Sequence, residues 1–200
     1  MGLISNGTTL LDAGAIDSGI AKGAMTLITT LTASNSATLD FTSGITSTYK
    51  KYVFKFVNIH PATDGAKFGF QFNADGASGF NETLTNTYFR SYHDEANTAT
   101  GVGYVTSEDQ GNGTSFTILD GGVGADADQC TAGHVKLFDP SNTSHVKHFI
   151  FRGTHYDVND FVADVFVGGY VNTTTAITEV QFKFASGNID AGTIKMYGVA

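Results

Sequence analysis

KFGFQFN, residues 67–73, alternates phenylalanine with polar or small residues. Successive side chains of a β-strand point to opposite faces of the sheet, so Phe68, Phe70 and Phe72 share one face of such a strand. Alternation of this kind is typical of a half-buried antiparallel strand. The stretch therefore predicts a strand that packs a row of phenylalanine rings against a core.

The same alternation recurs along most of the chain. VQFKF (180–184) and TIKMYGV (193–199) each place apolar side chains on one face, with Ile194 and Met196 as the expected inward residues of the second. FVADVFVGGYV (161–171) also favours a strand, because β-branched residues dominate it, and its Gly168–Gly169 pair predicts a bulge.

Two further stretches alternate in the same way. In YVFKFVNIH (52–60), one face would carry Tyr52, Phe54 and Phe56, and the other Val53, Lys55, Val57 and Ile59. In HVKHFIFR (145–152), one face would carry Phe149 and Phe151, and the other Val146 and Ile150.

Glycine, asparagine and aspartate cluster between the alternating runs and indicate turns. Asp75, in an Asp-Gly pair, favours a hairpin turn. About nine to eleven strand segments and no amphipathic helix predict an all-β fold, an antiparallel β-sandwich of the jelly-roll type. We expect one domain over residues 24–200 and an extended N-terminal arm over residues 1–23. The turn segments are NADGASG (73–79), GNG (111–113), DGGVGAD (120–126), DPSNTS (139–144) and SGNIDAG (186–192).

Charged residues are scarce in this chain of 200 residues. They make up 15% of it, against 41% for apolar residues. Soluble domains average about a quarter charged residues, so threonine, serine, asparagine and glycine must build much of this surface. Because charge repulsion helps to keep free proteins apart, low surface charge is typical of proteins that live packed against neighbours.

The charge balance and the sequence termini exclude several classes. A net charge of −8 with 11 lysines and arginines argues against a nucleic-acid partner, which needs a concentrated basic surface. No run of apolar residues is long enough for a membrane helix, and the N-terminus lacks the pattern of a secretory signal. The single Cys130 cannot form an internal disulfide and fits synthesis in a reducing cytoplasm.

Candidate metal ligands are few. His145 and His148 stand three residues apart, which places them on opposite faces of a strand and prevents them from sharing an ion. The glycine-rich segment with Asp120, Asp126 and Asp128 offers carboxylate oxygens of the kind that Ca²⁺ prefers, but it lacks the EF-hand spacing. A flexible turn between strands is the simpler interpretation, and calcium binding there stays open.

No catalytic constellation is evident. His93, Asp94 and Glu95 form the densest ionisable cluster, at the expected end of a strand, and indicate a solvated loop. No nearby cation in the sequence lowers the pKa of Cys130. Nucleophile-elbow, phosphate-loop and zinc-protease motifs are missing from the sequence. We therefore expect a protein that is not an enzyme, with no catalytic, cofactor-binding or metal-binding residues and no cofactor.

Four stretches resemble a family of virion structural proteins from tailed bacteriophages, particularly marine ones. That family often ends in a strand similar to SGNIDAGTIKMYG here. The resemblance implies a particle component made in the host cytoplasm and located in the virion, and it carries no catalytic residues. The four stretches are MGLISNGTTLLDAGAID (1–17), YKKYVFKFVNIHPATDGAKFGFQFNADG (49–76), LFDPSNTSHVKHFIFRG (137–153) and GGYVNTTTAITEVQFKFASGNIDAGTIKMYGVA (168–200).

Two classes of function follow. The first is a structural protein, a capsid decoration (cement) protein or a component of a head or tail appendage, forming a homotrimer and attached to the major capsid or tail protein through residues 1–23. The alternative is a receptor- or glycan-binding protein of a tail fibre or tip, since exposed aromatic rings often bind sugars on a host surface. The tyrosines available for that role are Tyr88, Tyr92, Tyr104, Tyr156 and Tyr170.

Overall fold

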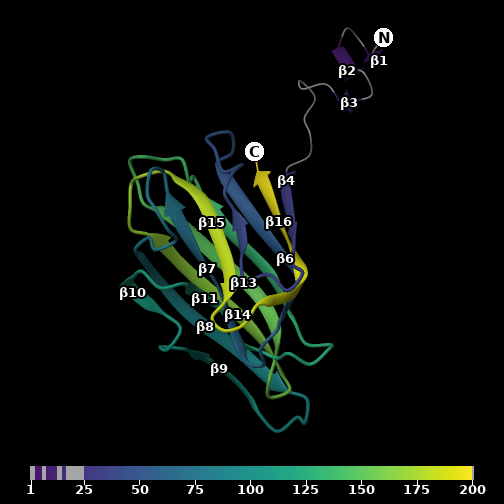
Figure 1. Ribbon diagram of the computed structural model, residues 1–200, viewed down its shortest axis with the longest axis vertical. Coiled ribbons are helices and arrows are strands. Elements are labelled where there is room, and N and C mark those ends of the chain that lie inside the picture. The colour runs from purple at the N-terminus through teal and green to yellow at the C-terminus, as the bar shows by residue number, and fades with distance from the viewer. Residues whose placement is uncertain (1–2, 6–7, 13–14, 17–24, 200) are drawn as a thin grey trace.

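The computed structural model describes residues 3–5, 8–12, 15–16 and 25–199 (Figure 1). Thirteen antiparallel strands form one nearly closed, barrel-like sheet, and three short strands near the N-terminus form a sheet of their own. The predicted all-β antiparallel class is confirmed. The predicted arm over residues 1–23 lies partly outside the described residues, and so does its boundary with the domain at residue 24.

The strands are long in the centre of the sheet and short at its margins. They are β1 (Leu3–Ser5), β2 (Thr8–Asp12), β3 (Ala15–Ile16), β4 (Met25–Thr32), β5 (Leu39–Phe41), β6 (Lys51–Pro61), β7 (Ala66–Ala74), β8 (Leu84–Asp94), β9 (Thr100–Tyr104), β10 (Gln110–Gly113), β11 (Thr117–Val123), β12 (Thr131–Phe138), β13 (Lys147–Asp157), β14 (Phe161–Val171), β15 (Ile177–Phe184) and β16 (Ile189–Val199).

The large sheet branches at β13. Its main path runs β4-β16-β6-β12-β13-β11-β7-β15-β5, while β14 pairs with the other side of β13 and carries β8, which in turn carries β9 and β10. β13 pairs along its length with β12 and β14, but β11 meets it at a single registered pair, Val123 with Asp157. The sheet folds back over itself at this point, so that β11, β7 and β15 face β6 and β13 across the core (Figure 1).

Phenylalanine rings fill the space between the two sides. Phe68, Phe70 and Phe72 on β7 are fully buried, as their alternation predicts. Phe70 packs edge-on against Phe149 of β13, with ring centroids 5.1 Å apart. Phe182 of β15 lies at the centre, since its ring contacts those of Phe41, Phe54, Phe56, Phe68 and Phe70 at centroid distances of 5.1–6.1 Å. Ile194 and Met196 are also fully buried, as predicted.

The polar face of β7 is covered as well, which the alternation did not predict. Gln71 is fully buried, and its amide Nε2 donates hydrogen bonds to the backbone oxygens of Glu82, Thr114 and Ser115. A buried amide keeps its donors satisfied in this way, because an unpaired polar group in a core is costly. The two loops that cover this face therefore complete the core on that side.

Bulges lie elsewhere than predicted. β14 pairs with β13 and β8 without a register shift, so the predicted bulge at Gly168–Gly169 is wrong. Gly169 is required instead for close approach, because a side chain there would collide with the Thr85 carbonyl oxygen and the Phe149 ring. β6 does shift register against β12 near Asn58, whose φ is 50°. That bulge turns Ile59 into the core while Val57 stays exposed, which corrects their predicted common face.

Several predicted turns are strands. GNG lies in β10, and Asp120–Val123 of the DGGVGAD segment lies in β11. Asp75 and Gly76 do form a turn, but β7 pairs with β11 and β15 and not with β8, so the turn closes no hairpin. Strand β16 begins at Ile189, inside the predicted final turn.

Candidate binding face and internal ion cluster

The three aspartates of the calcium hypothesis do not come together. Asp120 is fully buried in β11, whereas Asp126 and Asp128 are exposed in the loop that follows. Asp120 is thus part of the core and not of a flexible turn. Across the described residues, no three His, Cys, Asp or Glu side chains are grouped so as to hold a metal ion.

Asp120 belongs to an internal ion cluster that sequence reasoning missed. Its carboxylate accepts hydrogen bonds from the Thr131 hydroxyl and from His155 Nδ1, the latter at 3.0 Å. The other ring nitrogen of His155, Nε2, lies 3.7 Å from Asp157 Oδ2. His155 and Asp157 continue the inward alternation of Phe149 and Phe151 along β13, and that alternation is the signal that places them inside.

The cluster holds a charged imidazole inside the barrel. Burial alone would lower the pKa of His155, but the hydrogen bond to the Asp120 carboxylate and the negative charge of the nearby Asp157 outweigh burial and raise the pKa to about 9. Burial likewise opposes ionisation of Asp157, yet the nearby charged His155 and the hydrogen bonds from Asn159 bring its pKa below the ordinary value. The side chains of Asp120 and His155 are closed to solvent, so the cluster links β11 to β13 where the sheet folds back.

The other ionisable residues singled out in the sequence have separate local roles. Asp94 accepts hydrogen bonds from the Thr98 hydroxyl and from the backbone N–H groups of Thr98 and Ala99, and these bonds lower its pKa. The carboxylate of Glu95 accepts a hydrogen bond from the Tyr156 hydroxyl. His93 and Asp94 are the last two residues of β8 and Glu95 begins the loop that follows, so these residues lie at the end of a strand as predicted, but only Glu95 belongs to a solvated loop. Burial and the neighbouring Asp128 raise the pKa of the Cys130 thiol, which opposes formation of a reactive thiolate.

The two histidines of the metal hypothesis are both exposed and stand apart. His145 lies in the loop before β13, where its backbone N–H donates to the Asn142 side chain. His148 lies on β13 beside the Tyr170 ring, at 6.2 Å between centroids.

The five tyrosines do not form one sugar-binding surface. Tyr88 is buried, and burial raises the pKa of its hydroxyl. The prediction that Tyr88 is available to contact a sugar is therefore wrong. Tyr104 is 53% exposed on the marginal strand β9. The other three, Tyr92, Tyr156 and Tyr170, are half-buried on β8, β13 and β14.

Basic side chains gather on the outer face of the large sheet. Residues in register across neighbouring strands point to the same side, and Arg152 of β13, His134 of β12, Lys55 of β6 and Lys195 of β16 form one such row. Lys51 and Lys136 follow this row on the same side at alternate positions of β6 and β12. We call these residues the basic face: Lys51, Lys55, His134, Lys136, Arg152 and Lys195.

The lysines of the basic face lack counter-ions among the residues that the structure describes. Within residues 25–199, Lys51, Lys55, Lys136 and Lys195 make no ion pair. Lys55 lies directly opposite Lys195, and like charges in that arrangement destabilise a sheet. His134 stands between cations, so burial and then Lys136, Lys55 and Arg152 lower its pKa and keep the ring neutral near pH 7. The face therefore carries uncompensated positive charge on a chain of net charge −8.

Apolar side chains adjoin these charges. The guanidinium of Arg152 lies 4.0 Å above the ring of Phe166 and is held by Asp164, while Phe166 stacks on Phe89 at 4.8 Å. Phe89 and Ile150 are 42% and 43% exposed. Two shallow hollows of about 520 and 340 Å³ share His134 and Lys136 in their linings. Exposed apolar residues with arginine and aromatic rings are typical of the centre of a protein interface.

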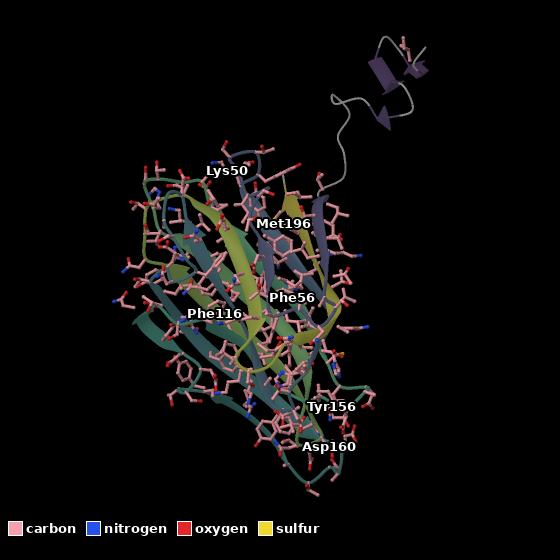
Figure 2. All side chains as sticks on the ribbon, viewed as in Figure 1. Lys50, Phe56, Phe116, Tyr156, Asp160 and Met196 are labelled. Carbon is pink, nitrogen blue, oxygen red and sulfur yellow. The ribbon has the colours of Figure 1, made fainter. Side chains whose placement is uncertain are left out.

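One end of the barrel is acidic. Its loops are held together, since Asp64 Oδ1 accepts a hydrogen bond from the Ala125 N–H and the Glu95 N–H donates to the Asp160 oxygen. These loops, residues 62–65, 95–99, 124–130 and 158–160, contain no lysine or arginine. Figure 2 shows Asp160 at the end of the barrel opposite Lys50. We call the exposed carboxylates of these loops the acidic end: Asp64, Glu95, Asp126, Asp128 and Asp160.

Reversing one charge of the basic face is expected to stabilise the isolated protein. Lys195→Glu replaces a like-charge cross-strand pair by an ion pair with Lys55, and we expect the free energy of unfolding to rise by about 0.5 kcal/mol. Urea denaturation at low ionic strength, at a protein concentration low enough for every variant to be monomeric, measures the change, and Lys195→Gln is the neutral control. An equal or lower stability for the glutamate variant would show that the two lysines do not repel each other.

Comparisons with protein-family models, with curated proteins and with solved structures find no match to the chain. In the part of the chain that the structure describes, no helix has the length and apolar character needed to cross a membrane.

Proposed function

We propose that the protein is a structural component of the virion of a tailed bacteriophage. In this proposal it is an oligomeric capsid decoration (cement) protein, or a component of a head or tail appendage, and residues 1–23 attach it to the major capsid or tail protein. The observation that carries the proposal is the division of the described chain: β1–β3 pair with one another alone, and the barrel-like body begins with β4. A barrel-like body, together with a short segment whose strands pair among themselves, suits attachment to neighbours.

The finer fold belongs to the same proposal. The branch at β13 allows the large sheet to be seen as a flattened sandwich, with β11, β7, β15 and β5 as one layer and the remaining strands as the other. We propose that this arrangement is of the jelly-roll type, with the segment before β4 as an extended arm. A homotrimer would place three such arms on a particle, so that weak contacts add through effective concentration.

The proposed role is not enzymatic. The buried ionisable groups Asp120, His155 and Asp157 lie inside the barrel and link its strands β11 and β13. A catalytic group must reach its substrate, and these side chains do not. Asp94 and Glu95 are likewise engaged in shaping their loop.

The alternative role, binding of a host-surface receptor or glycan, has one observation in its favour. Phe89 and Tyr104 are neighbouring exposed rings, paired in register on β8 and β9. Aromatic rings of this kind stack on sugar faces. A glycan array probed with the purified protein tests this role, and absence of binding at high protein concentration would set it aside.

Deletion of residues 2–22 is expected to abolish incorporation into particles, because it removes the proposed attachment segment and leaves the body intact. Particles assembled with the truncated protein are purified and analysed by quantitative mass spectrometry. The matched control carries the same residues 2–22 in scrambled order and is also expected to be missing from particles. Full occupancy by the truncated protein would refute attachment through the arm.

A further inference from the structure

We propose that the basic face of one copy of this protein docks the acidic end of a second copy. The inference deepens the proposed oligomeric role, on which it rests, by naming the two surfaces that meet. The charges, the strand register and the exposed apolar groups of the described residues support it.

Repulsion between like charges on the basic face destabilises the isolated protein. Lys55 and Lys195 lie directly opposite each other, and His134 adjoins Lys55 on the other side. Adjacent strands are about 4.8 Å apart, so the two ammonium groups and the neutral imidazole ring lie close together in one row. No carboxylate of residues 25–199 pairs with either lysine. Carboxylates of a docked partner would relieve this repulsion.

The acidic end is the matching surface on the same chain. Asp126 and Asp128 are exposed in the loop between β11 and β12, and their carboxylates accept no hydrogen bond from the described residues. Asp160 and Glu95 lie in adjoining loops, joined through the backbone. With no lysine or arginine in these loops, the end presents a concentrated negative charge. Charge complementarity of this kind orients partners and suppresses wrong pairings.

The contact must join different surfaces. A two-fold dimer that paired basic face with basic face would bring Lys55 and Lys195 of both copies together, and like charges in contact cost several kcal/mol. Docking of a face against an end is heterologous, and repetition of it generates a closed ring or an open chain. The proposed homotrimer is one closed form of this arrangement.

Apolar groups supply the centre of the contact. The hollows of about 520 and 340 Å³ beside His134 are lined in part by Ile150, Phe166 and Val53 and can receive protruding loop residues. Val158, between the acidic residues of its turn, is exposed. An apolar centre surrounded by opposite charges has the composition of a specific interface.

Sedimentation velocity of the purified protein at about 20 and 500 mM NaCl tests the proposal, because screening weakens contacts between exposed charges. We expect a species larger than the 21.1 kDa monomer at low salt and a shift toward monomer at high salt. Lys195→Glu is expected to abolish the larger species although it stabilises the monomer, whereas Lys195→Gln weakens association less. A monomer at every salt and protein concentration would overturn the proposal.

A charge exchange between the surfaces makes the test specific. Lys55→Glu/Lys195→Glu keeps a like-charge pair, so its monomer stability should match that of the natural chain, while the charge of the pair at positions 55 and 195 of the basic face is reversed. Asp126→Lys/Asp128→Lys reverses the charge of the loop between β11 and β12 at the acidic end. We expect each variant alone to be monomeric and an equimolar mixture to associate. Failure of the mixture to associate would overturn the proposal, and so would charge-dependent binding of a polyuronate by a protein that stays monomeric.

These measurements use purified protein and no particles. Loss of particle incorporation therefore bears on the proposed virion role, and loss of self-association bears on the docking of face against end.

Discussion

Phe182→Ala is expected to lower the free energy of unfolding by about 3 to 5 kcal/mol, the usual cost of removing a large aromatic side chain from a core. Phe182 is fully buried and its ring contacts those of five other phenylalanines. These rings come from both sides of the barrel, so the cavity would open where the two sides meet. Domains are stable by about 5 to 15 kcal/mol, and the loss would take much of that margin.

Urea denaturation followed by circular dichroism measures this change. The matched control is Phe116→Ala, because Phe116 is half-buried and its ring faces the ammonium of Lys183 at 4.2 Å outside the core. We expect the control to lose less than about 1 kcal/mol. Equal losses for the two variants would contradict the position of Phe182 at the centre of the core.

The free energy of unfolding is expected to fall as pH rises from about 6 to 10, because folding raises the pKa of His155 from 6.5 to about 9. A raised pKa means that the folded state holds this proton more tightly than the unfolded state. The contribution is complete below pH 6.5, decreases above it and is lost above about 9. One pKa unit corresponds to about 1.4 kcal/mol, so the cluster contributes about 3 kcal/mol when His155 is charged.

Asp120→Asn is the variant that assigns this effect to the cluster. It keeps the shape of the side chain but removes a buried counter-ion, and we expect a loss of about 3 kcal/mol at pH 7 together with a much flatter pH profile. Cys130→Ser controls for the thiol, whose pKa is also raised. A profile for Asp120→Asn as steep as that of the natural chain would show that His155 does not titrate as the geometry indicates.

The fold class was predictable because its signal is local. Alternation places Phe68, Phe182 and Met196 correctly, since the faces of a strand repeat every two residues whatever the neighbours are. Bulges escape such reasoning, as Asn58 shows, because a single residue of positive φ reverses the faces beyond it. The closure of the sheet through Val123 and Asp157 depends on contacts distant in sequence and has no local signal.

The candidate site was harder to predict because its residues are distant from one another in the sequence. Asp120 sits among glycines that indicate a turn, yet pairing with β7 makes the segment a strand and turns its carboxylate inward. Its partner His155 is 35 residues away. The basic face is assembled from four strands whose lysines and arginine are scattered along the chain. The net charge of −8 therefore gives no indication of this local excess of positive charge.

Imaging of phage particles that carry this protein with a C-terminal tag tests the central claim, that it is a structural component of the virion. Gold particles bound to the tag, seen by electron microscopy, are expected at regular positions on the head or on a tail appendage, with an occupancy that survives particle purification. Purified particles that lack the tagged protein, while infected cells contain it, would contradict the claim.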